Sequence, residues 1–259
     1  MSCIRVKIPE VTVVIPSYNQ GLYLAEAIQS VLDQDVEVEL VVVDGGSTDE
    51  SLSIIKRFEA NISWWRSAPD QGQAYAINEG VRKGTAPYVC WLNSDDYFLP
   101  GGLKSLLKTI KDHSTVPLVY GKAINKSEST GRETEIFVQP FDEKQMSRRC
   151  IISQPATLIR RKAWDEVGGL DVSMHMSMDY DLWWRLYKSA GPFEFVKSNI
   201  AVNRDHSATK TRNNRQQHYR ESMSTVKKYY GSIPLRWWLA QPYSIWYKAA
   251  LLKFTRLTK

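Results

Sequence analysis

The sequence is poor in cysteine. Its 259 residues contain three, Cys3, Cys90 and Cys150, which are widely spaced and form no CxxC pair. An odd number of cysteines at such spacing predicts neither a disulfide framework nor a zinc site. Cys90 lies within an apolar run, so we expect it to be a small core residue.

Long hydrophobic segments are also missing. No window of about 20 apolar residues occurs, so no membrane-spanning helix is predicted. The first residues, MSCIRVKIPEVTVV, contain no apolar stretch of signal-peptide length before polar residues and Pro16 interrupt them. We therefore expect a cytoplasmic protein in a reducing environment.

Acidic residues are absent from 232–259, whereas basic and aromatic residues alternate there. One interpretation is a charged, solvated helix face. Another is an interfacial segment that lies on anionic lipid, because tryptophan and tyrosine prefer partial burial with their polar ends in water. Pro234 and Pro242 exclude one uninterrupted helix. We expect this segment to contact the inner face of the cell membrane peripherally.

Several nucleotide-binding and nucleic-acid-binding motifs are missing as well. The net charge of +6 raises the possibility of a nucleic-acid partner. However, no known nucleic-acid-binding motif is present, and acids follow two predicted strands, where they would repel phosphate without a metal. Neither GxxxxGK[ST] nor a strand-following GxGxxG occurs, which excludes the usual phosphate loop and dinucleotide site. We expect no nucleic-acid partner.

The first two-thirds of the chain alternates between strand-like and helix-like patterns. This alternation predicts an α/β fold, with an open, mainly parallel sheet and helices on both faces. We expect a catalytic domain over residues 1–210 and a basic, helical, aromatic-rich extension over 211–259. The predicted strands and helices of the first part are 11–15 (ended by Pro16), 21–34, 38–43, 62–65, 74–83, 88–92 and 101–111.

Two polar clusters follow predicted strands, where ligands bind in folds of this class. The first, at 44–49, begins with Asp44 and contains two glycines that would let a ligand approach the main chain. Asp44 is either a turn residue or an acceptor for a base or ribose, and Ser47 to Glu50 has the form of a capping box. The second, at 93–96, is either a plain turn or a site for Mg²⁺ or Mn²⁺, which prefer oxygen ligands.

An ordered series of motifs resembles family 2 glycosyltransferases with the GT-A fold, over roughly residues 10–210. The resemblance implies metal-dependent, inverting transfer of a sugar from a UDP-, GDP- or dTDP-sugar to an acceptor hydroxyl. It also suggests an acceptor on a cell-envelope polysaccharide, a lipopolysaccharide or a lipid-linked saccharide. The motifs are VVIPSYN (13–19), VVVDGGSTD (41–49), PDQG (69–72), WLNSDD (91–96), SQP (153–155), VGGLD (167–171), MDYDL (178–182) and RDH (204–206).

The same resemblance implies a role for each matching residue. Asp95 and Asp96 would hold Mn²⁺ or Mg²⁺, with His206 near the metal or the diphosphate. Asp179 would be the catalytic base. The nucleotide would contact Pro16, Ser17, Tyr18, Asp44, Asp70 and Asn93.

Three positions leave alternatives open. Asn93 stands where the family's DxD motif often begins with Asp. The pair Met178–Asp179 stands where the family commonly has Glu–Asp, so one acid is missing. Either Asp179 or Asp181 could therefore be the base, although Asp181 could also be a first-turn acid that the helix dipole stabilises. His206 is either a ligand or a histidine at the edge of the core.

Alternative functions remain open at this stage. A catalytically inactive nucleotide- or carbohydrate-binding module could share the fold, and so could a nucleotidyltransferase, which would release pyrophosphate. The QxxRW signature of processive, membrane-embedded synthases is absent. We therefore expect addition of a single sugar rather than polymer synthesis.

Overall fold

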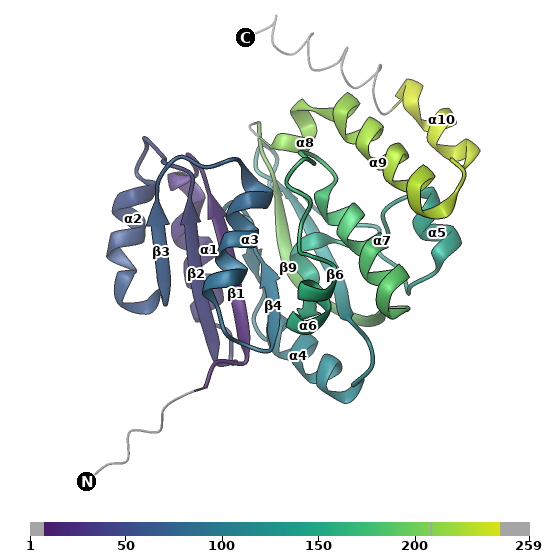
Figure 1. Cartoon of the computed structure of the whole chain (residues 1–259). Helices are drawn as coiled ribbons and strands as arrows, with labels where there is room; N and C mark the ends of the chain where they lie inside the picture. The colour runs from purple at the N-terminus through teal and green to yellow at the C-terminus, as the bar shows by residue number, and fades with distance from the viewer. Residues whose placement is uncertain (1–7, 208, 244–259) are drawn as a thin grey trace, which may run out of the picture.

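A single mixed sheet forms the centre of the molecule in the computed structural model, which describes residues 8–207 and 209–243 (Figure 1). In this part of the chain, nine strands are arranged in the order β3-β2-β1-β4-β8-β6-β9-β5, and β7 pairs with β6. The strands are β1 (Val11–Ser17), β2 (Val38–Asp44), β3 (Trp64–Ser67), β4 (Tyr88–Trp91), β5 (Tyr97–Phe98), β6 (Leu118–Ser127), β7 (Glu133–Glu135), β8 (Thr157–Arg160) and β9 (Glu194–Asp205).

Helices cover both faces of this sheet (Figure 1). Because side chains alternate along a strand, Val41 and Val43 of β2 pack into one core cluster, and Leu40 and Val42 into the other. The first cluster includes residues of α3, α6, α7, α9 and α10, and the second includes residues of α1, α2 and α4. The helices are α1 (Gly21–Leu32), α2 (Ser51–Arg57), α3 (Gln73–Lys83), α4 (Gly102–Asp112), α5 (Glu143–Arg148), α6 (Arg161–Glu166), α7 (Met178–Ala190), α8 (Lys210–Asn213), α9 (Arg215–Tyr230) and α10 (Leu235–Gln241).

The predicted α/β class is confirmed, but parallel pairing makes up a smaller part of the sheet than expected. The strands β3, β2, β1 and β4 are parallel to one another, as β-α-β units require. Beyond β4, strand β8 runs antiparallel to both β4 and β6, and only β6 and β9 are parallel. Long connecting segments separate these later strands in the chain, and the sequence of such a segment does not indicate the direction of the strand that follows it.

The prediction that Pro16 ends the first strand is wrong, because β1 continues to Ser17. The Val14 carbonyl accepts a bond from Leu92 next to β4, and the Ser17 carbonyl accepts one from Gly45 next to β2. Since alternate residues point to opposite neighbours, Pro16 points to the β4 side. The ladder with β4 stops at Val14, so Pro16 lies beyond its paired part, at a strand end where a proline without an N–H is tolerated.

The described part of the C-terminal extension packs against α7. The Glu221 carboxylate of α9 accepts bonds from the backbone N–H groups of Met176 and Ser177, at 2.7 and 2.9 Å. Trp237 of α10 is buried, and its indole N–H donates to the Ser147 carbonyl at 2.7 Å. The division of the chain at residue 210 stays a prediction, and residues 244–259 of the predicted membrane segment lie outside the described residues. Within the described ranges, no helix has both the length and the apolar character needed to cross a membrane.

Candidate active site

A cavity of about 850 Å³ opens beyond the carboxyl ends of β1 and β4. Residues at the starts of α3, α7 and α8 complete its wall. The structure thus brings together residues that are up to 195 positions apart in the sequence, from Pro16 to Thr211. The predicted site residues that line it are Pro16, Ser17, Tyr18, Asp70, Asn93, Asp95, Asp96 and Asp179.

Asp44 does not line this cavity and is completely buried beneath the loop that follows β2. One carboxylate oxygen accepts bonds from the backbone N–H groups of Gly46 and Ser47 and from the Ser67 hydroxyl, at 3.1, 2.8 and 2.6 Å. The other accepts a bond from the Ser47 hydroxyl at 2.5 Å. Asp44 therefore shapes the loop that borders the cavity, and its predicted contact with the base stays a prediction.

The predicted capping box of Ser47 and Glu50 is wrong, because the Ser47 hydroxyl is bound to Asp44. Since its hydroxyl binds Asp44, Ser47 does not cap a helix, and α2 begins only at Ser51. The carboxylate of Asp49 accepts bonds from the backbone N–H groups of Ser51 and Gly21, at 3.0 and 2.8 Å. Asp49 thus joins the starts of α1 and α2 beside the cavity.

The wall near β1 contains a polar group that is left without a partner in the described part of the chain and a glycine at a close approach. The Ser17 hydroxyl is buried and has no hydrogen-bond partner among the described residues. A buried hydroxyl without a partner is costly, so a ligand atom is its natural partner. Gly45 lies between Tyr18 and Asp70, where an added Cβ would come within 3.3 Å of the Tyr18 ring. The loop carrying Asp70 is fixed because its carboxylate accepts a bond from the Gly72 N–H at 2.8 Å and faces Arg66 at 3.4 Å.

The turn after β4 holds its acids by a local network. Asn93 donates to the Asp96 carboxylate at 3.1 Å and accepts from Gln73 at 2.8 Å. Asp96 also accepts a bond from the backbone N–H of Arg204 at 3.0 Å. Burial, followed by the neighbouring Asp95 carboxylate, raises the pKa of Asp96 to about 8. Asn93 and Asp96 therefore brace the turn, and Asp95 is left facing the cavity.

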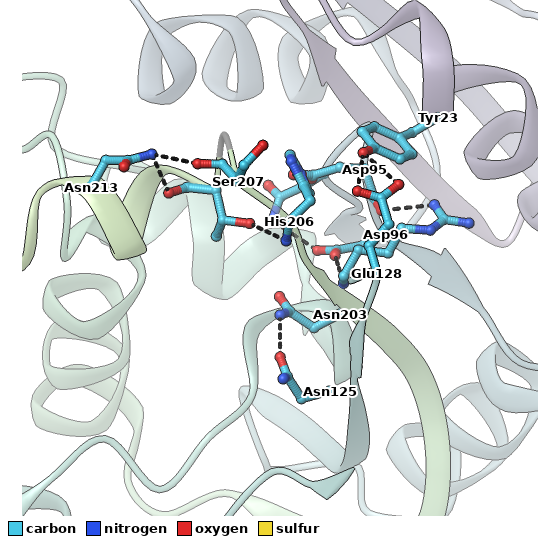
Figure 2. Close-up of polar contacts among 12 residues, drawn as sticks. Tyr23, Asp95, Asp96, Asn125, Glu128, Asn203, His206, Ser207 and Asn213 are labelled. Atoms are coloured by element: carbon cyan, nitrogen blue, oxygen red, sulfur yellow. Dashed lines mark hydrogen bonds and ion pairs between the residues drawn. The ribbon is translucent and has the colours of Figure 1, made fainter. Parts of the chain in front are cut away.

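Asp95 forms a pair with His206 at the end of β9 (Figure 2). His206 Nε2 lies 2.9 Å from Asp95 Oδ2, and the imidazole is buried. The Tyr23 ring lies against it, with 4.8 Å between ring centroids. The Tyr23 hydroxyl donates to the Glu128 carboxylate at 2.8 Å, and burial and this contact raise the Tyr23 pKa to about 12. His206 therefore lies beside the turn after β4, and its predicted place near a metal or a diphosphate stays a prediction.

The donor set suits a divalent cation only if a substrate supplies further ligands. Among residues 8–207 and 209–243, no group of three His, Cys, Asp or Glu side chains could hold an ion. Asp95 and His206 offer one oxygen and one nitrogen, and 19% of the Asp95 side chain is exposed. Magnesium commonly takes one or two carboxylates and completes its shell with substrate phosphates. The Asp95 carboxylate is the kind of oxygen ligand that Mg²⁺ and Mn²⁺ both prefer, so the residues present fit either ion once substrate phosphates complete the shell.

Asp179 occupies the cavity wall at the first turn of α7. Burial raises the pKa of its carboxyl to about 6, although bonds from backbone N–H groups and the charge of Lys210 oppose the rise. A carboxylate with a pKa near neutrality can accept a proton from a reacting hydroxyl. Geometry and pKa therefore both suit a general base.

Asp181 is turned away from the cavity into a buried ion pair. Its carboxylate accepts bonds from Arg185 at 2.7 Å and from the Tyr229 hydroxyl at 3.0 Å, and 3% of the side chain is exposed. Arg185 in turn donates to the carbonyls of Val167 and Gly169. Of the two candidate bases, the geometry favours Asp179.

We expect Asp181→Asn to lower the free energy of unfolding by about 3 kcal/mol, because it leaves the half-buried Arg185 cation without its carboxylate partner. Urea unfolding measures this loss, with Asp112→Asn at an exposed helix end as the control. A variant as stable as the wild type would contradict a structural role for Asp181.

Sequence patterns did not reveal several residues of this site. The guanidinium of Arg204 donates to the Asp95 carbonyl at 2.8 Å and lies between the rings of Tyr23 and Tyr97, 5.3 and 4.6 Å from their centroids. Lys210 lines the cavity, and its ammonium lies 3.4 Å from Gln73. Burial lowers the Lys210 pKa, and the charges of Glu221 and Asp179 partly offset this. Arg204 belongs to the RDH motif, but the resemblance implied a role only for His206 of that motif. No sequence signal pointed to Lys210.

Known glycosyltransferases resemble this chain over most of its described length. The sequence model of the family "Glycosyl transferase family 2" matches residues 12–168. Chondroitin synthase of Escherichia coli is 26% identical over 201 residues, which are 76% of this chain and 29% of that protein. Hyaluronan synthase of Pasteurella multocida is 27% identical over 201 residues, 76% of this chain and 20% of that protein. The chain thus spans less than a third of the length of these relatives.

Solved structures share its fold. The mannosyltransferase PcManGT of Pyrobaculum calidifontis, in complex with GDP-Man and Mn²⁺, has a TM-score of 0.69 at 19% identity, over 98% of this chain and 77% of that one. TarS of S. aureus, residues 1–349 with UDP-GlcNAc, has a TM-score of 0.67 at 18% identity, over 85% of this chain and 67% of that one. The chain belongs to glycosyl transferase family 2 and has the GT-A fold.

Proposed function

We propose that this glycosyltransferase transfers a single sugar from a nucleoside-diphosphate sugar to an acceptor hydroxyl, with inversion at the anomeric carbon and with the help of Mn²⁺ or Mg²⁺. The observation that carries the proposal is the position of Asp179. It is a carboxylate with a pKa raised to about 6, and it lines the same cavity as Asp95 and the Ser17 hydroxyl.

The cation would be held by Asp95 and His206, and Asp96 and Arg204 would keep the turn in place. A bound divalent cation supplies charge stabilisation for the departing diphosphate and fixes its orientation. Lys210 adds a positive charge on the same cavity wall, where the negative donor would gain from it.

Asp179 would accept the proton of the acceptor hydroxyl while its oxygen forms a bond to the anomeric carbon. The bond from that carbon to the diphosphate breaks in the same step, and its electron pair leaves with the nucleoside diphosphate. Direct displacement by one nucleophile inverts the configuration at this carbon. One well-placed base suffices for this reaction, and it needs no covalent enzyme intermediate.

The donor nucleoside would lie against Pro16, Ser17 and Tyr18, with Asp70 nearby. Proteins of similar fold have been solved with UDP-GlcNAc and with GDP-Man. UDP-, GDP- and dTDP-sugars are therefore the donors to compare. The acceptor that we propose is a cell-envelope glycan or a lipid-linked saccharide.

Release of nucleoside diphosphate from a panel of UDP-, GDP- and dTDP-sugars tests this function. We expect release from one donor class, with Mn²⁺ or Mg²⁺ required and one sugar added per acceptor when candidate saccharides are supplied. Release of pyrophosphate would show a nucleotidyltransferase instead. A folded protein that binds a donor and never turns it over would be an inactive module.

The transfer rate should depend on the ionisation of Asp179. Because the base acts in its charged form, kcat should be constant above pH 7 and fall tenfold per pH unit well below the pKa of about 6. The same group affects stability with the opposite sign. Its folded pKa is raised, so its contribution to folding is greatest below its unfolded pKa near 4 and is lost as the pH rises through about 6. A pH profile of kcat without a break between pH 5 and 7 would contradict this assignment.

A further inference from the structure

The short helix α10 exposes an apolar face. The side chains of Leu235, Trp238 and Leu239 are 69%, 53% and 70% exposed, and their spacing of i, i+3 and i+4 places them on one side of the helix. Trp237 lies on the opposite side, where its ring packs against Tyr180 and Tyr219 in the core. The helix is therefore anchored by one tryptophan and presents another tryptophan to the outside.

Arginines surround this apolar face. Arg148 of α5 and Arg236 border a surface hollow together with Leu235 and Leu239. Burial lowers the pKa of Arg149, and the nearby positive charge of Arg236 lowers it further. We call Arg148, Arg236, Leu235, Trp238 and Leu239 the α10 surface. The sequence from 232 to 259 contains no acidic residue.

The α10 surface is connected to the active-site cavity through its neighbours. The guanidinium of Arg149 lies over the ring of Phe137, 3.9 Å from its centroid, and 47% of Phe137 is exposed. The residues next to these two in the chain, Ile136 and Cys150, line the active-site cavity. A membrane or molecule bound to the α10 surface would therefore lie near the cavity wall that contains Ile136 and Cys150.

We propose that the α10 surface binds the interface of an anionic lipid bilayer. An amphipathic helix with leucine and tryptophan on one face and arginine at its border lies in the interfacial plane of a membrane. Tryptophan favours the headgroup level, and each basic residue near an anionic surface strengthens binding about fivefold. A protein partner of matching shape would need acidic groups against both arginines, whereas an anionic bilayer provides such charge at every position.

Vesicle cosedimentation of the full chain tests this proposal without any sugar donor, so its outcome is separate from that of the proposed function. The probes are vesicles of phosphatidylcholine alone and of phosphatidylcholine with phosphatidylglycerol. We expect binding to the anionic vesicles, weakened at least tenfold by Leu235→Glu with Leu239→Glu. Arg148→Gln with Arg236→Gln should weaken it at least tenfold on anionic vesicles only.

Matched controls separate this surface from general effects of charge. Leu22→Glu with Val172→Glu changes two exposed apolar residues elsewhere, and Lys56→Gln with Arg57→Gln removes two exposed charges from α2. Both controls should bind like the wild type, and all variants should keep its melting temperature. Equal binding of the α10 variants and the wild type would overturn the proposal. So would a stable wild-type dimer that the Leu235→Glu and Leu239→Glu pair dissociates, since a second copy would then cover this surface.

Discussion

Replacement of Asp179 by asparagine is expected to lower kcat by about 10³-fold or more, while nucleotide binding stays within a factor of two of the wild type. The asparagine side chain has nearly the same volume and can still accept a bond from the Tyr180 N–H. It cannot take up a proton, and general-base catalysis contributes roughly 10²–10⁴-fold in enzymes. Steady-state transfer assays at saturating donor, with binding measured by calorimetry, give both quantities.

Asp181→Asn, two residues away, is the matched control for this result. It should lose stability through the broken pair with Arg185, yet keep most of its kcat at a temperature where it is folded. If Asp179→Asn lost donor binding together with kcat, Asp179 would have a structural or donor-binding role. If Asp181→Asn lost kcat and Asp179→Asn did not, the two assignments would be reversed.

Replacement of Asp95 by alanine should remove the response to Mn²⁺. In the wild type, Asp95 faces the cavity beside His206, and these two side chains are the metal ligands that we propose. We expect Asp95→Ala to bind Mn²⁺ in the presence of nucleoside diphosphate at least tenfold more weakly, because a charged ligand is lost where only two protein ligands exist. Transfer should then be undetectable at millimolar Mn²⁺.

Calorimetric titration of Mn²⁺ into the protein–nucleotide complex measures this loss independently of turnover. Asp112→Ala, at the exposed end of α4, serves as the control and should bind Mn²⁺ like the wild type. An Asp95→Ala variant that binds Mn²⁺ and transfers sugar normally would place the metal elsewhere or make the reaction independent of it.

The order of motifs was sufficient to predict the fold class, and eight of the predicted site residues line the cavity. The place of Asp95 after a buried strand was a local signal, because parallel strands bring their carboxyl ends to one edge of a sheet. Ser17, the last residue of β1, and Asp179, in the first turn of α7, carried no such signal. Only the resemblance to family 2 glycosyltransferases assigned these two residues to one site, although 162 positions separate them.

What the sequence could not indicate depends on long-range partners. Ser47 matched a capping box, but the buried Asp44 carboxylate is a stronger partner for its hydroxyl. Pro16 was expected to end a strand. Strand β1 continues past it because the ladder with β4 has already ended at Val14, so Pro16 lies beyond the paired residues. Arg204 braces a turn that lies 108 positions earlier, through contacts for which no local pattern exists.

Thermal unfolding of the wild type, Asp95→Ala and Asp179→Asn with UDP, GDP and dTDP, each with and without Mn²⁺, tests the central claim most directly. A ligand at a hundred times its dissociation constant stabilises the folded state by about 2.7 kcal/mol, which is a clear shift in melting temperature. The account predicts a Mn²⁺-dependent shift with one nucleotide, present in the wild type and Asp179→Asn and absent in Asp95→Ala. No shift of the folded wild type with any nucleotide, or an equal shift in Asp95→Ala, would contradict it.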